Sequence, residues 1–165
     1  MKISLRWLVE KGACEEARKA HEKKWGTGDV EYQDVLNALA EKDRADWASW
    51  LMNAAGPTKD ILKIDGDLVK ETSIFFCGTI KVTGRIAAKF IFSGEGIKAG
   101  SDIEAGWGIK AGSGIEAGSD IKAGSDWGIY AGIGLRVSLK SKHAIVISKN
   151  KPKNLICGEY REVSK

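Results

Sequence analysis

The side chains that most often perform acid–base or nucleophilic catalysis are scarce in this sequence of 165 residues. There are two histidines: His21 lies in a charge-rich segment with a helical pattern, and His143 follows Lys142 in a segment expected to turn. Proton transfer needs an acid or base held against a reacting group, whereas we expect both histidines at the surface. We therefore assign no catalytic residue and favour a protein that is not an enzyme.

Motifs for metals and cofactors are weak. Gly-Ser-Asp occurs three times, at 100–102, 118–120 and 124–126. The calcium-binding β-roll requires a nonapeptide Gly-Gly-x-Gly-x-Asp repeat instead. Gly-x-Gly at 94–96 and 106–108 is not followed by a helical pattern, so it does not form a dinucleotide-binding fingerprint. We expect no metal and no cofactor.

Non-covalent binding is the chemistry that the sequence favours. Trp107 and Trp127 each precede Gly-Ile, and Tyr130 follows the second of these segments. Exposed Trp and Tyr are enriched among the residues that dominate protein interfaces. The residues after successive isoleucines alternate in charge: Lys98, Glu104, Lys110, Glu116 and Lys122. These eight residues are the candidate partner-binding surface. For Trp107 and Trp127 themselves, a stacked pair that only shields the edge of the fold is the favoured interpretation, and an anchor for a partner is the other.

The element that must position these residues shows a period of six. A large aliphatic residue recurs in two series separated by a one-residue slip near 90–91, namely Leu62, Leu68, Ile74, Ile80 and Ile86, then Ile91, Ile97, Ile103, Ile109, Ile115 and Ile121. A short strand followed by a bend explains this spacing, because Ile and the Ala two positions later then point inward. We expect the glycines to provide the backbone freedom for each corner. The pattern predicts a parallel β-helix.

Charge alternation predicts the length of a coil. With 12 residues per coil, Lys98 would stack on Lys110 at the strand spacing of about 4.8 Å, which is destabilising. With 18, Lys98 stacks on Glu116 and Glu104 on Lys122. A triangular coil of three six-residue faces, repeated a little over four times, is therefore predicted for residues 59–139.

Two further features follow from this register. Trp107 and Trp127 are 20 apart, so the two extra residues within 125–128 restore the stack, and both rings should lie outside or half outside. One face carries Phe75, Phe92, Lys110 and Tyr130 outward; we expect the helical segment or another subunit to cover it.

Residues 1–58 form the predicted helical domain. A segment with Leu5 and Leu8 should end at Gly12, and a second should end at Gly26. Asp29 is a candidate cap for a third helix. A fourth, rich in tryptophan, should end before Gly56. The expected fold class is thus α+β.

Residues 140–165 are predicted to form C-terminal strands that close the β-helix. This end is basic, and its candidate patch is Arg136, Lys140, Lys142, Lys149, Lys151 and Lys153. A lysine-rich edge that prevents strand pairing between molecules is favoured. A surface that contacts nucleic-acid phosphates is the less favoured interpretation, because the zone lacks interleaved aromatic residues before Tyr160.

The expected compartment is the cytoplasm. The three cysteines are far apart and include no Cys-x-x-Cys pair, which is typical of reduced thiols. Arg6, Glu10 and Lys11 interrupt the apolar stretch that a signal peptide needs. No apolar run approaches the length needed to cross a bilayer, so we expect no membrane partner.

Three resemblances bear on function. The Ile-x-x-Gly repeats at 62–139 resemble bactofilins, bacterial cytoskeletal proteins whose triangular β-helices polymerise end to end; here the preceding helices are expected to block one stacking end. Leu5-Arg-Trp-Leu-Val-Glu-Lys-Gly-Ala-Cys14, Asp46-Trp-Ala-Ser-Trp-Leu51 and the Ile-Lys-Ala-Gly/Ile-Glu-Ala-Gly repeats together resemble small uncharacterised proteins of phages and prophages. The six-residue period also resembles hexapeptide acyltransferases, but Lys or Glu here follows Ile, and Gly comes third.

The phage resemblance implies a binding protein that blocks a host machine in the bacterial cytoplasm. Small phage proteins without catalytic residues often act in this way, CRISPR effectors being among their targets. We therefore expect a non-enzymatic inhibitor of a host defence or nucleic-acid machine, with a host protein or nucleoprotein complex as partner. A self-assembling, bactofilin-like scaffold, hence a homo-oligomer, is the alternative, and an acyltransferase is a remote one.

Overall fold

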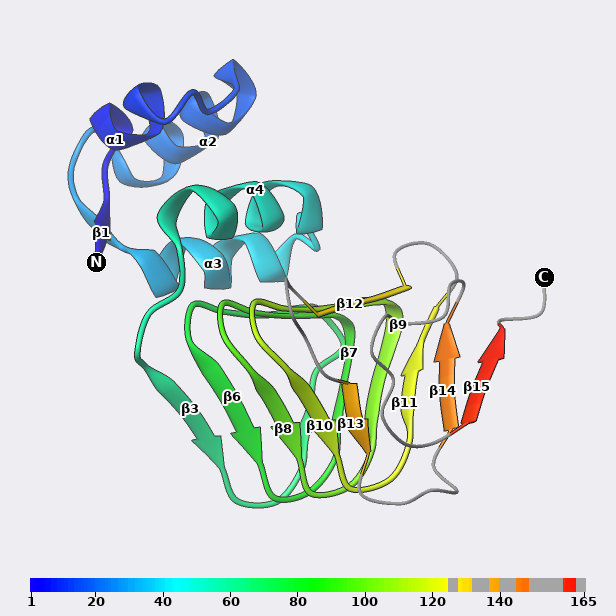
Figure 1. The fold of residues 1–165 in the computed structure, drawn as a ribbon. Coiled ribbons are helices and arrows are strands. Elements are labelled where there is room, and N and C mark those ends of the chain that lie inside the picture. Colours follow the sequence, from blue (N-terminus) through cyan, green and yellow to red (C-terminus); the bar gives the residue numbers. More distant parts are fainter. Residues whose placement is uncertain (125–127, 132–136, 140–144, 149–158, 163–165) are drawn as a thin grey trace.

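The computed structural model describes residues 1–124, 128–131, 137–139, 145–148 and 159–162. Within these residues, four helices precede a parallel β-helix of about four coils, which C-terminal strands extend (Figure 1). The predicted α+β architecture is therefore confirmed. The helices are α1 (Leu5–Glu10), α2 (Glu15–Trp25), α3 (Tyr32–Glu41) and α4 (Ala45–Ala55).

The helix ends agree with the sequence prediction, and a side-chain cap marks the start of the first helix. The Ser4 side chain accepts a hydrogen bond of 3.2 Å from the Trp7 amide and so caps α1. Helices α2 and α4 end at Gly26 and Gly56, whose φ angles of 70° and 76° lie in the left-handed region that glycine adopts without strain.

The predicted cap at Asp29 is wrong. Helix α3 begins at Tyr32, and Glu31 occupies the N-cap position without a side-chain hydrogen bond. The reason is a two-stranded pairing that the sequence pattern did not indicate: β1 (Lys2–Ile3) runs antiparallel to β2 (Val30–Glu31). This pairing brings the start of the chain against the start of α3.

The coils have three faces. The first face contains β3 (Ile61–Ile64), β6 (Thr79–Val82), β8 (Ile97–Ala99), β10 (Ile115–Ala117) and β13 (Val137–Leu139). The second contains β4 (Leu68–Val69), the first halves of β7 (Ile86–Ser93) and β9 (Ile103–Ala111), then β11 (Ile121–Ala123), β14 (Ile145–Ser148) and β15 (Glu159–Glu162). The third contains β5 (Ile74–Phe76), the second halves of β7 and β9, and β12 (Gly128–Ala131).

The strand register confirms the predicted coil length. Ile97 pairs with Ile115 and Ile103 with Ile121, each 18 residues apart. Lys98 consequently faces Glu116, and their side chains form an ion pair of 3.1 Å. The predicted slip is present too, as an irregularity in the β7–β9 pairing between residues 88 and 90.

The interior of the coils is built from the repeated isoleucines and the alanines that follow them. Each isoleucine from Ile80 to Ile121 in the series is at most 2% exposed. Each such side chain contributes roughly 2 kcal/mol of burial free energy. The coil therefore owes its stability to a continuous apolar stack.

The corner glycines are required for a reason other than the predicted one. None of those within the repeat at 78–124 has a positive φ angle. Instead, a β-carbon on Gly118 would lie 1.8 Å from the carbonyl oxygen of Gly100 in the preceding coil, and one on Gly100 would lie 1.8 Å from that of Thr83. Glycine is needed because adjacent coils touch at the corners.

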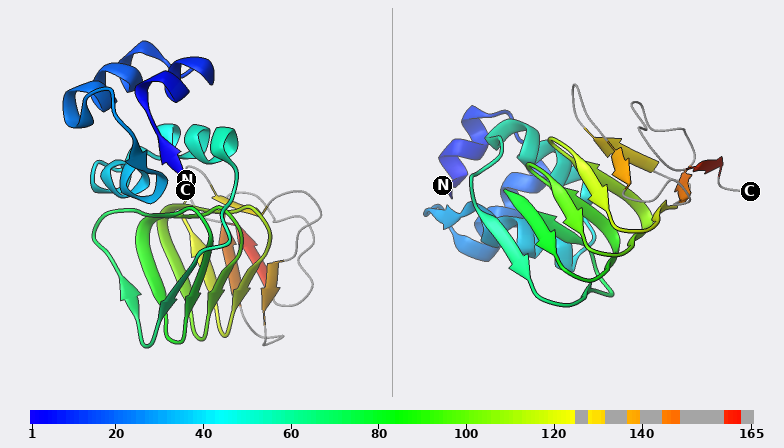
Figure 2. Two further views of the ribbon diagram at one scale, coloured as in Figure 1. Left: turned by 90° about the vertical axis from the view of Figure 1, so that its left-hand side faces the viewer. Right: turned by 60° about the horizontal axis from the view of Figure 1, so that its bottom comes forward.

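The helical domain lies along one side of the β-helix, over the third face (Figures 1 and 2). Phe75 and Phe92 point outward from this face but are only 2% and 1% exposed, because they join the core of the helical domain. Gln33 of α3 also binds the β5 main chain, accepting from the Cys77 amide and donating to the Phe75 carbonyl. The prediction that the helical segment covers this strip is confirmed for both phenylalanines.

The helices do not block the first end of the β-helix. Helix α3 borders that end, but a hollow of about 540 Å³ remains there. Leu62, Leu68 and Phe76 line it and are only half-buried. The expectation of a blocked end is therefore wrong, because the helices pack against the side of the coils.

The C-terminal strands continue the coils in parallel. Strand β13 pairs with β10, β14 with β11, and β15 with β14. The basic patch predicted from Arg136, Lys140, Lys142, Lys149, Lys151 and Lys153 lies outside the described residues, as does His143.

Candidate partner-binding site

The third face of the coils carries one column of outward side chains. The strand register places Phe75, Phe92, Lys110 and Tyr130 in line. The helical domain covers the two phenylalanines, whereas Tyr130 is 55% exposed. The column therefore emerges from beneath the helices at Lys110 and ends in an exposed aromatic ring.

Lys110 is held between the two domains. Its Nζ atom donates to Ser49 Oγ at 2.7 Å and to Asn53 Oδ1 at 3.1 Å, both on α4. The Nζ atom also lies 6.0 Å from the centroid of the Tyr130 ring. Burial lowers the pKa of Lys110, and no carboxylate in the described part of the chain pairs with it.

Trp107 occupies a bulge on the same strand. Ala105 pairs with Ala88 and Gly108 with Phe90, so Gly106 and Trp107 together oppose one residue of β7. A bulge of this kind turns a side chain away from the regular alternation. The Trp107 ring packs edge-on against Phe90 at 5.1 Å and stays 40% exposed, which confirms that it lies half outside.

An ion pair lies beside the Trp107 ring. Lys89 Nζ lies 5.7 Å from the centroid of the Trp107 ring and pairs with the Asp43 carboxylate. Burial acts to raise the pKa of Asp43, but hydrogen bonds from Lys89 and Ser73 outweigh it and hold that pKa below its ordinary value. Sequence reasoning missed Asp43 and Lys89, because they lie in different domains and share no motif.

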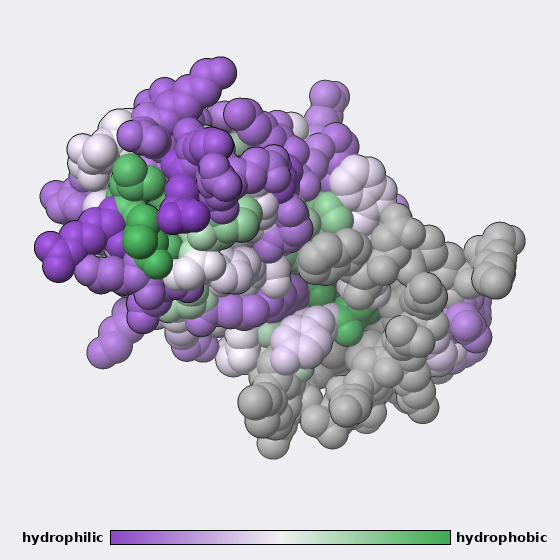
Figure 3. Space-filling model, turned by 90° about the horizontal axis from the view of Figure 1, so that it is seen from above, coloured by the Kyte–Doolittle hydropathy of each residue, from purple (hydrophilic) through white to green (hydrophobic). Residues whose placement is uncertain are grey.

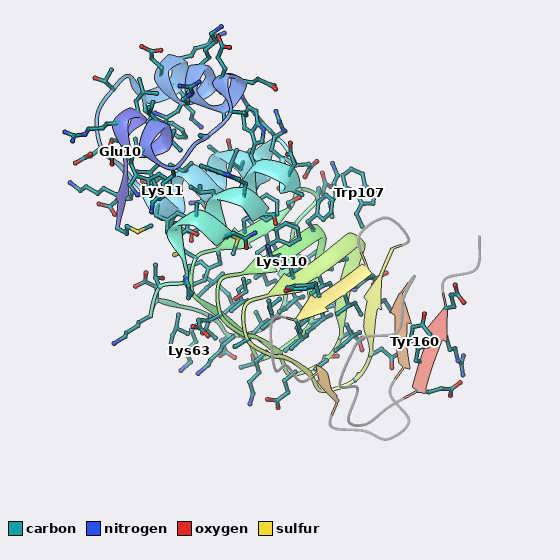
Figure 4. All side chains as sticks on the ribbon, turned by 45° about the horizontal axis from the view of Figure 1, so that its top comes forward. Glu10, Lys11, Lys63, Trp107, Lys110 and Tyr160 are labelled. Carbon is teal, nitrogen blue, oxygen red and sulfur yellow. The ribbon has the colours of Figure 1, made fainter. Side chains whose placement is uncertain are left out.

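The structure brings together only part of the predicted surface. Trp107 and Lys110 lie on the side that carries the helices (Figure 4), and Tyr130 pairs in register with Lys110. Lys98 and Glu116 lie on the first face, and Glu104 and Lys122 on the second, paired in register. Trp127 lies outside the described residues. We refer to Trp107, Lys110 and Tyr130 as the aromatic–lysine site.

The helical domain next to this site has a mostly hydrophilic surface (Figure 3). Figure 3, which looks onto the helices, shows a largely polar surface with a small hydrophobic patch on the helical domain. Among the described residues, the exposed large hydrophobic side chains are those of Met1, Val9, Ile61, Val69, Trp107 and Tyr130. Trp107 and Tyr130 are the two aromatic members of this set, and both belong to the aromatic–lysine site.

Groups suited to covalent chemistry are absent from this site as far as the structure describes it. The Cys77 thiol is buried, and burial raises its pKa, which disfavours the nucleophilic thiolate. His21 is also buried, at 3% exposure, so the expectation that it lies at the surface is wrong. It packs within the helical domain against Trp25, with ring centroids 5.1 Å apart.

Comparisons with protein-family models, curated proteins and solved structures found no match. In the described part of the chain, no group of three His, Cys, Asp or Glu side chains could hold a metal ion. None of the helices described is long and apolar enough to cross a bilayer.

Proposed function

We propose that this chain is a non-enzymatic binding protein that engages a protein partner through the aromatic–lysine site. The observation that carries the proposal is that two exposed aromatic side chains accompany the half-buried Lys110, which has no carboxylate partner in the described part of the chain. Aromatic rings contribute large contact areas at low entropic cost. The parallel coils beneath them supply a rigid support.

The partner should present a carboxylate beside an apolar side chain. The Lys110 ammonium is partly desolvated before binding, so a carboxylate would gain a charge-assisted hydrogen bond without the full cost of stripping water from the lysine. The exposed ring of Tyr130 would pack against the neighbouring apolar group. An acidic protein surface therefore fits the site better than nucleic acid, whose phosphates favour several cations together.

The biological role remains the one that the phage resemblance implies. We propose that the partner is a host protein or nucleoprotein complex of a defence or nucleic-acid machine, and that binding blocks it. A stiff β-helix with an added helical layer suits steric blockade. The whole molecule can cover a wide area of its partner although it touches the partner through a small contact surface.

Site-directed photocrosslinking in a host lysate tests the proposal. A crosslinking amino acid at Tyr130 should label one partner band, and Trp107→Ala or Lys110→Gln should each reduce that band by at least about tenfold. A crosslinking amino acid at Lys63, on the first face, is the control. It should not label the partner band that the crosslinker at Tyr130 labels. Unchanged labelling in both variants would remove the aromatic–lysine site from the interface.

Self-assembly is the second candidate function, and the open first end of the β-helix favours it. Strands β3 and β4 end their sheets there, and half-buried Leu62 and Leu68 line the hollow. Unpaired strand edges beside apolar side chains promote strand addition. Light scattering across protein and salt concentration separates the candidates: filaments support the scaffold, and a discrete monomer or dimer opposes it.

A further inference from the structure

The helical domain contains a cavity that the aromatic–lysine site does not use. It has a volume of about 290 Å³ and lies between α2, α3 and α4, with α1 at one side. Its apolar walls include Leu8, Trp25, Leu39, Trp47, Trp50 and Leu51. Cavities of about this volume fall at the lower end of the range for small-molecule sites.

The tryptophans of this cavity are only half-buried, unlike the neighbouring core. Trp25, Trp47 and Trp50 all retain exposed surface, whereas Leu51 is 2% exposed. Three indole rings around one hollow leave a large apolar and aromatic surface that nothing in the described chain fills. A flat apolar molecule could cover this surface and gain its burial free energy.

His21 adds a polar group to the cavity lining. Its two ring nitrogens are inaccessible to solvent and make no well-formed hydrogen bond, although main-chain groups of Gly26 and Ile3 lie near the ring. A buried imidazole without satisfied hydrogen bonds is costly. His21 therefore gives the hollow a polar group beside its apolar walls.

The rim of the cavity is positively charged. Arg44 stacks on Trp47, with its guanidinium carbon 3.4 Å from the ring centroid, but its charge is already matched by Asp46 and Glu16. Lys24 lies over Trp25 at 4.8 Å, and in the described chain neither Lys24 nor Lys42 has a carboxylate partner. Two uncompensated cations therefore flank the opening.

We propose that this cavity binds a small amphipathic anion with a flat apolar body and a carboxylate or sulfonate group. The body would lie among Trp25, Trp47 and Trp50, and the anionic group would meet Lys24 and Lys42. A neutral molecule would gain the apolar contacts only, and a cation would be repelled at the rim. The site is independent of the proposed partner-binding function.

Two fluorescent probes of similar shape test both parts of the proposal. The anion 8-anilinonaphthalene-1-sulfonate should bind the full chain at a single saturable site, and the uncharged N-phenyl-1-naphthylamine should bind more weakly. In the double variant Lys24→Gln/Lys42→Gln, the affinity for the sulfonate should fall by about tenfold, while that for the neutral probe changes by less than about twofold. Lys23→Gln, one position away on α2 and outside the lining, is the matched control and should change neither affinity.

A cavity-filling variant locates the bound probe. Ala17 lines the cavity and is half-buried, so Ala17→Phe should abolish the binding of both probes while circular dichroism still shows a folded protein. Probe binding that survives Ala17→Phe, or an equal loss of both probes in the lysine variant, would overturn the proposal. Should Ala17→Phe fail to fold, the comparison of Lys24→Gln/Lys42→Gln with Lys23→Gln still decides it.

Discussion

Tyr130 pairs with Lys110 across β12 and β9, although the two residues are 20 apart and the preceding coils repeat every 17 or 18 residues. The two additional residues lie between Ala123, which pairs with Ala105, and Gly128, which pairs with Gly108. Gly128 has a φ angle of 66°. The insertion thus leaves the stack in register and places an aromatic ring next to the half-buried ammonium. This local geometry connects the repeat to the proposed binding site.

Replacing Lys110 with methionine should separate stability from binding. The ammonium is partly desolvated and has no carboxylate partner among the described residues. Removing this desolvation cost should therefore offset the loss of the hydrogen bonds to Ser49 and Asn53. We expect Lys110→Met to change the free energy of unfolding by less than about 1 kcal/mol and to weaken partner binding by at least about tenfold. Urea titration and a binding assay measure the two quantities, and a large loss of stability would show that Lys110 is structural.

A methyl group at a corner of the coil should be far more damaging than one on an open turn. A β-carbon on Gly118 would collide with the Gly100 carbonyl oxygen, so Gly118→Ala should lower the free energy of unfolding by about 3 kcal/mol or more. Gly28 has open space around it and no positive φ angle. Gly28→Ala is therefore the control and should change stability by less than about 0.5 kcal/mol in urea titration. Equal effects would refute the close-contact explanation.

The coil could be predicted from the sequence because its repeat satisfies two independent rules. The isoleucine spacing defines which side chains face inward, and the alternation of Lys98, Glu104, Glu116 and Lys122 selects 18 residues over 12. The charge rule holds only in the later coils, however. In the first coils Lys63 lies in register with Lys81, and Lys81 with Lys98, which apolar stacking evidently outweighs.

The candidate sites were less accessible to sequence reasoning because each joins segments that are far apart in the chain. The aromatic–lysine site depends on Ser49 and Asn53, which no local pattern connects with Lys110. The buried position of His21 depends on its contact with Trp25 and on the β1–β2 pairing around Ile3. Its charged neighbours in α2 suggested a surface position, but His21 is the one residue of that helix that is fully buried.

His21 should make stability depend on mildly acidic pH. Burial lowers its pKa in the folded protein below the unfolded value of about 6.5. Between these two pKa values the unfolded chain binds more protons, so the free energy of unfolding falls as the pH drops below about 6.5, and the fall ends below the folded-state pKa. Asp43 and Asp46, whose pKa values are also lowered, contribute only in the more acidic range of carboxylates.

The variant His21→Gln isolates this effect. It removes the titrating group while keeping a polar side chain of similar size, so the slope of stability between pH 6.5 and the carboxylate range should disappear. Urea titrations across that pH range measure it. A slope that persists unchanged in the variant would assign the dependence to other groups.

Gln33 should be an important polar connection between the helical domain and the β-helix, in addition to the Asp43–Lys89 ion pair and the hydrogen bonds of Lys110 to α4. Its side-chain amide donates to the Phe75 carbonyl at 2.8 Å and accepts from the Cys77 amide at 3.0 Å, along the edge of β5 that none of the described strands covers. Gln33→Ala would leave both main-chain groups unpaired in buried residues, so we expect a loss of about 2 kcal/mol or more in the free energy of unfolding. Hydrogen exchange at the Cys77 amide should accelerate as well, because the acceptor that Gln33 provides is lost. Glu41→Ala, at an exposed position of the same helix, is the matched control and should cost less than about 0.5 kcal/mol. Similar losses in the two variants would mean that the apolar contacts of Phe75 and Phe92 hold the domains together without this connection.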